Sequence, residues 1–159
     1  MKVSIKNYLP LIYIYLISLI LALCYNFYFQ IPARNFLVVF LGIFSITFGA
    51  LKIIRLNDFV EAFSEYDFIS QKSRVYGYLF PFFELFFGLS FLLLIDNLLI
   101  ELFCLTFFTI NLFSVILALQ KKQKFICACL GDLIKVPLSK VSLIENLTMI
   151  FGILFLILT

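Results

Sequence analysis

The stretch VYGYLFPFFELFFGLSFLLLI, residues 75–95, decides the fold class because it is almost entirely apolar apart from Glu84. A run of about 20 apolar residues, at 1.5 Å per residue, is long enough to cross the roughly 30 Å hydrocarbon layer of a bilayer as an α-helix. The whole chain has this character, with 64% hydrophobic and 13% charged residues, against roughly 45–50% and about 25% in soluble domains. The sequence therefore predicts an all-α integral membrane protein.

Apolar runs of this length recur along the chain, and each predicts a transmembrane helix. They cover residues 8–28, 36–54, 75–95, 98–119 and 141–158. The first follows two lysines, as the core of a signal peptide would, but it exceeds a signal core of about 7–15 residues and no small-residue cleavage site follows it. We therefore expect a polytopic protein with five transmembrane helices: an additional N-terminal helix in residues 1–35 and a four-helix membrane domain in residues 36–159.

The positions of Lys and Arg predict the orientation, because cytoplasmic flanks of membrane helices retain these residues. With the N-terminus inside, eleven of the twelve Lys and Arg residues fall on the cytoplasmic side, and Arg34 alone falls outside. We expect a multi-pass protein of the bacterial inner membrane, with the N-terminus and residues 121–140 in the cytoplasm and the C-terminus outside. The net charge of +3 then reflects topology and contact with the lipid bilayer, and requires no nucleic-acid partner.

The segment RLNDFVEAFSEYDFISQKSR, residues 55–74, separates the second and third spans. Its apolar residues recur at near-helical spacing with acidic residues between them, which predicts an amphipathic helix at the membrane interface. The apolar set is Phe59, Val60, Phe63, Tyr66 and Phe68, and the acidic set is Asp58, Glu61, Glu65 and Asp67. Because lipid-binding helices of the cytoplasmic leaflet are usually basic, we expect this one to pack against the mouth of the bundle.

Polar residues within the spans need partners, because an ionisable group in hydrocarbon costs several kcal/mol. Glu84 falls near the middle of its span, roughly 14 Å from the cytoplasmic end, and Asn111 lies at a similar depth. Lys52 ends the second span, and Glu145 and Asn146 lie in the first two turns of the fifth. If these helix faces converge, the five residues form a polar cluster in the cytoplasmic half of the bundle.

Simpler structural roles are open for the same residues. Lys52 can extend its ammonium to the interface, Glu84 can pair with it or stay protonated, and the asparagines can simply link helices by hydrogen bonds. Pro81 adds interest to Glu84, because a proline three residues earlier loosens the helix. Glu101, near the outer end of the fourth span, is expected at the interface.

The stretch KFICACLGD, residues 124–132, contains two cysteines one residue apart, Cys127 and Cys129. Gly131 and Pro137 argue against a helix here, and in an extended segment residues two apart point the same way, so both sulfurs can face one point. Such a pair can bind Cu(I) or Zn(II) as thiolates, or alternate between dithiol and disulfide. An inert pair in a loop is the third possibility.

The remaining residues narrow the metal chemistry. The chain contains no histidine, so a metal site has to use sulfur, carboxylate or amide oxygen. Cys24 and Cys104 lie within apolar spans, too far from the loop to complete a zinc site with four cysteine ligands. We expect both to be small buried hydrophobic residues.

Three stretches together resemble the MauE/DoxX family of small redox-associated membrane proteins. The family pattern is a helix ending in lysine, an acidic-aromatic segment with a tyrosine, a helix with Pro and Glu-Leu, and a Cys-x-Cys-x-Gly loop before the last helix. The stretches are LKIIRLNDFVEAFSEYDF, YGYLFPFFELFFGLSFLL and NLFSVILALQKKQKFICACLGDLIKVPLSKVSLIENLTM. The resemblance covers about residues 36–158, and the matching positions are Lys52, Phe59, Tyr66, Pro81, Glu84, Cys127, Cys129, Gly131 and Asn146.

The resemblance implies an auxiliary membrane protein linked to methylamine utilisation, where MauE proteins are thought to help mature or export the disulfide-rich small subunit of methylamine dehydrogenase. DoxX relatives are tied to quinone-linked thiosulfate oxidation. The implied chemistry is thiol redox or maturation work by Cys127, Cys129 and Glu84, with a proton or a quinone headgroup held by Asn111, Glu145, Asn146 and Lys52. The cytoplasmic placement of the loop stands in tension with disulfide maturation of an exported enzyme.

Two alternatives belong to other classes of protein. The first is a soft-metal binding or transfer protein in which Cys127 and Cys129 capture Cu(I) or Zn(II). The second is a structural assembly partner whose polar residues only hold helices together. The redox hypothesis implies a thioredoxin-like partner, and the metal hypothesis implies a partner with a heavy-metal-associated domain. A self-contained soluble enzyme is not expected.

Overall fold

The computed structural model describes residues 9–29, 32–95, 97–120 and 138–158, and these ranges are helical without any strand. The helices are α1 Leu9–Phe29, α2 Ala33–Ile54, α3 Leu56–Tyr66, α4 Arg74–Leu92, α5 Leu98–Gln120 and α6 Leu138–Leu158. Within the described part of the chain, five helices, all except α3, are long and apolar enough to cross a membrane. The predicted all-α polytopic fold is therefore confirmed.

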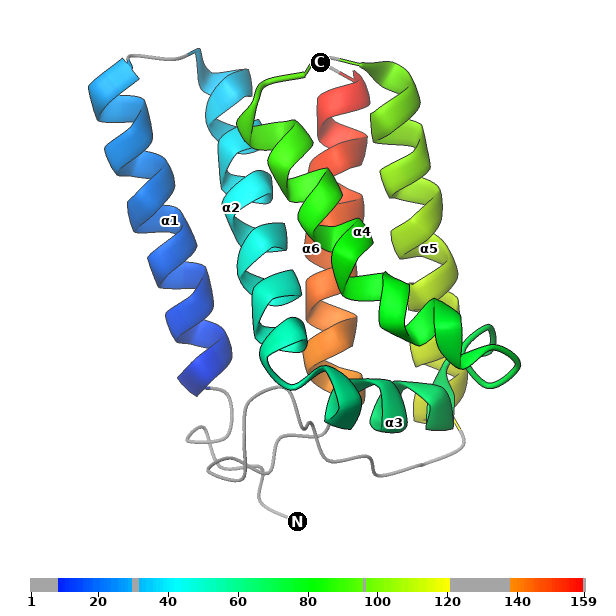
Figure 1. Ribbon diagram of the computed structural model, residues 1–159. Helices are drawn as coiled ribbons and strands as arrows, with labels where there is room; N and C mark the ends of the chain where they lie inside the picture. The colour runs from blue at the N-terminus through cyan, green and yellow to red at the C-terminus, as the bar shows by residue number, and fades with distance from the viewer. Residues whose placement is uncertain (1–8, 30–31, 96, 121–137, 159) are drawn as a thin grey trace.

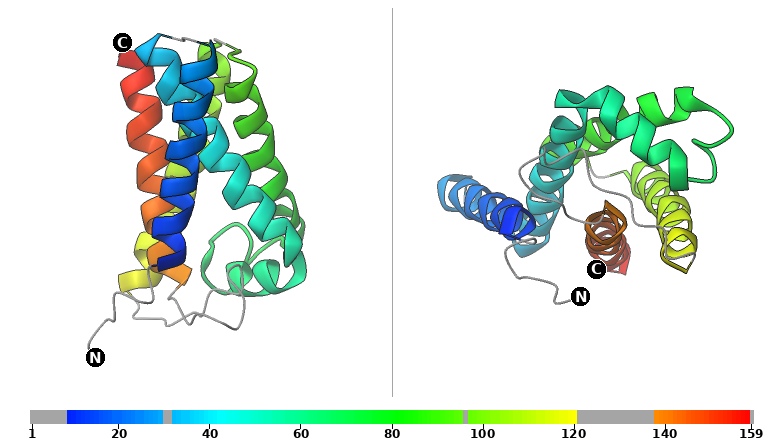
Figure 2. Two further views of the ribbon diagram at one scale, coloured as in Figure 1. Left: turned by 90° about the vertical axis from the view of Figure 1, so that its left-hand side faces the viewer. Right: turned by 90° about the horizontal axis from the view of Figure 1, so that it is seen from below.

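The five long helices run up and down beside one another, and α3 lies across one end of the bundle (Figure 1). That end also holds the last turns of α2 and α5 and the first turns of α1, α4 and α6. Seen along the bundle, α6 lies between α2 and α5, while α1 stands at the outside against α2 (Figure 2). Many large apolar side chains on the outer faces of α1, α4 and α5 are exposed, which is the surface that contacts lipid.

Helices α2 and α4 are in backbone contact, because glycines lie where they cross. A Cβ added to Gly88 would lie 2.8 Å from the carbonyl oxygen of Gly42, and one added to Gly49 would lie 3.0 Å from that of Pro81. Ser45 Oγ donates a hydrogen bond of 2.9 Å to the carbonyl oxygen of Glu84. Small residues of this kind let membrane helices approach closely, so the depth of Glu84 relative to α2 is set by packing.

Helix α3 is amphipathic and packs against the end of the bundle, as its sequence predicts. Its buried residues are Phe59, Val60, Phe63 and Tyr66, and its acidic residues Asp58, Glu61 and Glu65 are exposed. The ring of Phe63 lies 4.8 Å from that of Phe80 on α4, which in turn stacks 4.7 Å from Phe107 on α5. A continuous aromatic core therefore joins α3 to α4 and α5.

The pattern fails at the end of α3, where two expectations from the sequence are wrong. Phe68 is exposed and Asp67 is fully buried, the reverse of their predicted faces. The helix ends at Tyr66, so its periodicity does not extend to these two residues. Instead, Asp67 Oδ1 accepts hydrogen bonds from the backbone N–H groups of Ile69 and Ser70, at 3.1 and 2.7 Å, and shapes the turn into α4.

Candidate functional site

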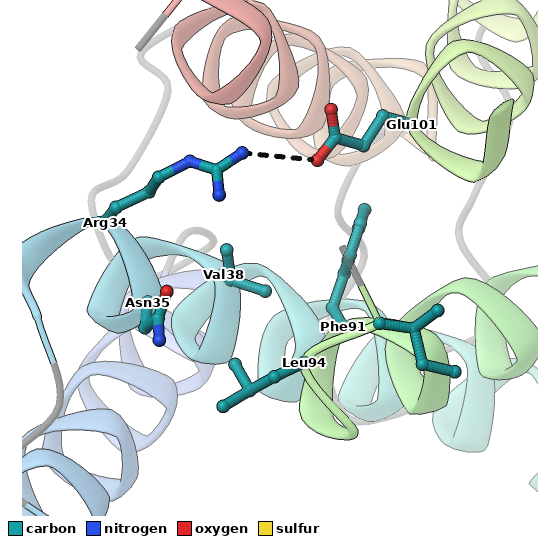
Figure 3. Close-up of a pocket in the computed structure, with 7 residues that line it drawn as sticks. Arg34, Asn35, Val38, Phe91, Leu94 and Glu101 are labelled. Carbon is teal, nitrogen blue, oxygen red and sulfur yellow. Dashed lines mark ion pairs between the residues drawn. The ribbon is translucent and has the colours of Figure 1, made fainter. Parts of the chain in front are cut away.

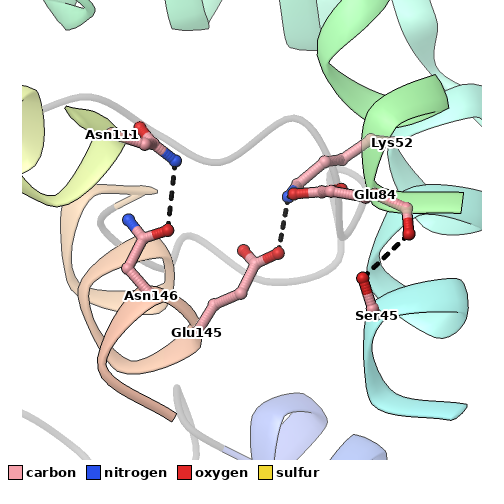
Figure 4. A network of polar contacts seen from close by, with 6 residues as sticks. All are labelled: Ser45, Lys52, Glu84, Asn111, Glu145 and Asn146. Atoms are coloured by element: carbon pink, nitrogen blue, oxygen red, sulfur yellow. Dashed lines mark hydrogen bonds and ion pairs between the residues drawn. The ribbon is translucent and has the colours of Figure 1, made fainter. Parts of the chain in front are cut away.

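A lysine and two glutamates from three helices meet inside the bundle (Figure 4). Lys52 Nζ, from the last turn of α2, donates to Glu145 Oε1 on α6 at 2.7 Å and also to Glu84 Oε1 on α4. The three residues are 5%, 3% and 0% exposed, in the order Lys52, Glu145 and Glu84. Lys52 therefore pairs with carboxylates in the interior and does not extend to the interface, which removes one of the simpler roles considered for it.

Aromatic rings surround the lysine ammonium. Lys52 Nζ lies 5.1 Å from the ring centroid of Phe80, 5.6 Å from that of Phe48 and 5.7 Å from that of Phe59. The faces of these rings attract a cation and separate the ammonium from water. Electrostatic attraction in such surroundings is stronger than in solvent, so the two carboxylates and the rings hold the charge in one position.

Two asparagines extend the cluster toward α5. Asn111 Nδ2 donates to Asn146 Oδ1 at 3.2 Å, and Asn146 follows Glu145 directly on α6. The five side chains predicted from the sequence to form a polar cluster thus point into one region between α2, α4, α5 and α6 (Figure 4). Three of their buried atoms have no hydrogen-bond partner among the described residues: Glu84 Oε2, Asn111 Oδ1 and Asn146 Nδ2.

The charge of this cluster is unbalanced when every group is ionised, because one ammonium faces two carboxylates. An uncompensated negative charge in a medium of low polarity is costly. A single proton on one carboxyl makes the cluster neutral, and Glu84 Oε2 is a buried oxygen without a hydrogen-bond partner in the described part of the chain. The geometry therefore suits the storage and transfer of one proton.

Some neighbours of the cluster were not predicted from the sequence. The hydroxyl of Tyr15 on α1 hydrogen-bonds to that of Thr148 on α6, three residues after Glu145 in the sequence. The sequence of α1 does not single out this position, because the same helix carries other tyrosines, of which Tyr13 and Tyr28 are exposed.

Glu101 lies in the first turn of α5, at the end of that span as the sequence predicts, but its side chain is buried between helices. It is only 6% exposed and forms an ion pair with Arg34, with Arg34 Nη2 at 3.9 Å from Glu101 Oε1. The first turn of α5 faces the first turn of α2 at this end of the bundle, so Arg34 provides the positive charge that allows Glu101 to be buried.

The four cysteines divide into two groups. Cys127 and Cys129 lie outside the described residues, so their predicted thiol or metal chemistry stays a prediction. Cys104 is buried as expected, but Cys24 is exposed, and the expectation that it is buried is wrong. Helix α1 packs chiefly on α2, which leaves the rest of its surface open, and Cys24 lies on that open surface. Among the described residues, no group of three or more Cys, Asp or Glu side chains is arranged to hold a metal ion.

The fold and the site together define a multi-pass α-helical membrane protein with an ion cluster buried between its helices. The family model described as methylamine utilisation protein MauE matches residues 30–159. Since this match covers most of the chain, the protein belongs to the MauE family. The resemblance to DoxX proteins stays a prediction from the sequence. No curated protein and no solved structure matches the chain.

Proposed function

We propose that this chain is an accessory membrane protein of methylamine utilisation that carries out thiol–disulfide chemistry during the maturation of a partner protein. Cys127 and Cys129 are the redox pair in this proposal, and the buried cluster is its proton site. The observation that carries it is the position of Lys52 between Glu84 and Glu145 inside the bundle. Ionisable groups in membrane spans are costly and commonly mark proton or substrate pathways.

The chain connectivity supports a link between the two cysteines and the cluster. Their segment joins Gln120 to Leu138, which both lie at the same end of the bundle as α3. Glu145 is in the second turn of α6, about 10 Å along the helix from Leu138. The orientation predicted from the basic residues places this end in the cytoplasm of a bacterial cell, and we keep that orientation as part of the proposal. Electrons then pass into the membrane from cytoplasmic thiols, so the partner is oxidised on the cytoplasmic side and is not an enzyme that folds after export.

The redox step needs an acceptor for two electrons and two protons, and a membrane quinone is the class of molecule that takes both. Two cysteine thiols then become one disulfide while the quinone becomes a quinol. The residues fit such a headgroup: Asn146 Nδ2 is a buried donor without a partner among the described residues, as a carbonyl ligand requires. Glu84 holds one proton at Oε2, Lys52 balances the remaining carboxylate, and Asn111 orients Asn146 through its hydrogen bond.

The test uses the full-length protein in nanodiscs, with Cys24→Ser and Cys104→Ala removing the other thiols. Alkylation of Cys127 and Cys129 is counted by mass spectrometry after addition of a short-chain quinone. We expect the two thiols to become resistant to alkylation, and a reductant to restore their labelling. Glu84→Gln should slow the oxidation at least about 100-fold, the usual contribution of a proton-transferring side chain.

Controls separate this proposal from the other functions. Glu61→Gln, which changes an exposed glutamate on α3, should oxidise at the wild-type rate. If the quinone leaves the alkylation of Cys127 and Cys129 unchanged but Cu(I) or Zn(II) protects them, the redox proposal is contradicted and soft-metal handling is supported. Normal partner maturation in cells that carry Cys127→Ser and Cys129→Ser together would leave only the assembly role.

The helix α1, which ends at Phe29, precedes the matched residues 30–159. We propose that it is an addition to a four-helix functional domain, held against that domain by its packing on α2 and by the hydrogen bond between Tyr15 and Thr148. Replacement of Tyr15 by Phe should then loosen α1 and leave the thiol oxidation rate nearly unchanged.

A further inference from the structure

A second polar site lies at the opposite end of the bundle from the ion cluster. It is a pocket of about 140 Å³ lined by Arg34, Asn35, Val38, Phe91, Leu94, Ile95 and Glu101. Arg34 and Glu101 face each other across it (Figure 3), with 3.9 Å between Nη2 and Oε1. That distance is longer than a hydrogen bond, so these two atoms form an ion pair without a hydrogen bond between them.

The wall of the pocket is apolar and includes an unusual backbone conformation. Val38, Phe91, Leu94 and Ile95 form this wall. Leu94 has a φ of 51° in the turn that ends α4, a left-handed position where glycine is the usual residue. A leucine at such a position is strained, and here its side chain lines the pocket. The pocket therefore combines a cation, an anion and an apolar wall at the end of the membrane-spanning helices.

We propose that this pocket binds the phosphoethanolamine headgroup of a phospholipid. The phosphate pairs with the Arg34 guanidinium, whose planar donors match phosphate oxygens, and the ammonium pairs with the Glu101 carboxylate. The first acyl carbons lie against Phe91 and Leu94. A volume of about 140 Å³ holds about ten water-sized groups, which is enough for the phosphate and the ethanolamine together.

The charges of the pocket select among headgroups. A choline headgroup has no N–H to donate to Glu101 and carries three methyl groups. A glycerol headgroup brings no positive charge, so the buried Glu101 carboxylate, 8% exposed as a side chain, would repel its phosphate. Ethanolamine supplies a compact cation with three donors. This selection is independent of any chemistry at the cysteines.

The test counts lipids retained by the full-length protein. The protein is reconstituted in an equal mixture of phosphatidylethanolamine, phosphatidylcholine and phosphatidylglycerol, transferred to detergent, and analysed by native mass spectrometry. We expect phosphatidylethanolamine to be retained about tenfold over the other two, the effect of one charge-assisted hydrogen bond. Glu101→Gln should abolish this preference and favour phosphatidylglycerol, because the carboxylate that attracts the ethanolamine ammonium and repels the phosphate is then absent. Arg34→Gln should lower retention of all three lipids.

Matched controls lie at the other end of the bundle. Arg55→Gln and Glu65→Gln change exposed residues near α3 and should leave the lipid pattern unchanged. Circular dichroism checks that each variant is folded. If Arg34→Gln does not fold, Arg34→Lys serves instead, and it should keep the preference for ethanolamine while holding lipid more weakly.

Addition of free phosphoethanolamine tests whether the pocket binds the headgroup alone or requires the whole lipid. Displacement of the retained lipid shows that the headgroup alone is sufficient, and retention of the lipid shows that the acyl chains are also required. Equal retention of the three lipids by the wild type would overturn the proposal. So would an unchanged preference in a folded Glu101→Gln variant.

Discussion

Lys52 and Glu145 are 93 residues apart in the sequence, and their side chains form a hydrogen-bonded ion pair of 2.7 Å inside the bundle. This contact ties the last helix to the second, while Glu84 ties the fourth helix to the same ammonium. A buried ion pair adds little net stability over apolar residues of similar size, but removal of one partner is costly because the other charge is left buried.

Removal of the ammonium should therefore destabilise the bundle strongly. Lys52→Met leaves two carboxylates without their cation, and we expect it to lower the free energy of unfolding by about 3–5 kcal/mol. Helicity followed by circular dichroism during titration with SDS in mixed micelles measures this loss. Lys72→Met, at an exposed lysine beyond α3, is the control. Addition of Glu84→Gln and Glu145→Gln should restore most of the loss, and a Lys52→Met variant as stable as the control would contradict the interpretation.

A side chain larger than that of glycine should destabilise the crossing of α2 and α4. A Cβ on Gly88 would lie 2.5 Å from Ile46 Cγ1 and 2.8 Å from the carbonyl oxygen of Gly42. Gly88→Ala should therefore lower the free energy of unfolding by about 1–3 kcal/mol, the usual cost of overpacking. In Gly152→Ala the three atoms nearest the new Cβ all belong to the Leu41 side chain, at 2.7–3.2 Å, and none is backbone, so the loss should be smaller. Both variants are compared in the same SDS titration, where an equal loss would argue against backbone contact at Gly88.

The two asparagines should behave as a coupled pair. Asn111→Leu or Asn146→Leu alone leaves a buried amide without its partner and should cost about 1–3 kcal/mol. The double replacement removes both amides, so its cost should be smaller than the sum of the two. A double-mutant cycle on the free energy of unfolding measures this coupling. Strictly additive losses would show that the bond between the two amides contributes nothing.

Asp67 should make the turn after α3 sensitive to pH. Burial raises the pKa of its carboxyl above the ordinary value of 3.8, against the lowering effect of the hydrogen bonds from the backbone N–H groups of Ser70 and Ile69. The protonated Asp67 carboxyl therefore makes its full contribution to the free energy of unfolding below about pH 3.8, the pKa of an ordinary Asp. This contribution is lost as the pH rises through the higher pKa of the folded state. Asp67→Asn keeps the Oδ1 acceptor without a charge, so it should flatten the fall in unfolding free energy toward pH 7.

The control for that measurement is Asp58→Asn, at an exposed position on α3. Its pH profile should run parallel to that of the wild type. Thermal unfolding at several pH values between about 4 and 7 provides the comparison. Identical slopes for the wild type and Asp67→Asn would show that the buried carboxyl does not titrate in this range.

The membrane spans and the polar cluster could be predicted from the sequence because both depend on local chemistry. A long apolar run leaves few options besides a transmembrane helix, and charged residues within such runs have to find one another. Lys52, Glu84 and Glu145 meet for that reason. The functional roles proposed for them, and those of Cys127 and Cys129, stay predictions.

Features that depend on neighbours could not be predicted in the same way. Helix α1 is apolar on all sides, so nothing in its sequence shows that Cys24 lies on the open surface. The burial of Asp67 follows from the end of α3 at Tyr66, which the apolar spacing does not mark. The pairing of Arg34 with Glu101 requires the first turns of two helices to meet, which is a property of the assembled bundle.

The order of the helices along the chain gives the ion cluster a consequence for biosynthesis. Helices α2 and α4 leave the ribosome before α6, and chains begin to fold from their N-terminal parts. Lys52 and Glu84 can therefore meet first as a neutral pair, and Glu145 brings the second carboxylate when the last helix is inserted. Insertion of α6 therefore adds the second carboxylate to a pair that is already neutral, and the three-residue cluster is complete only when the last helix is in place.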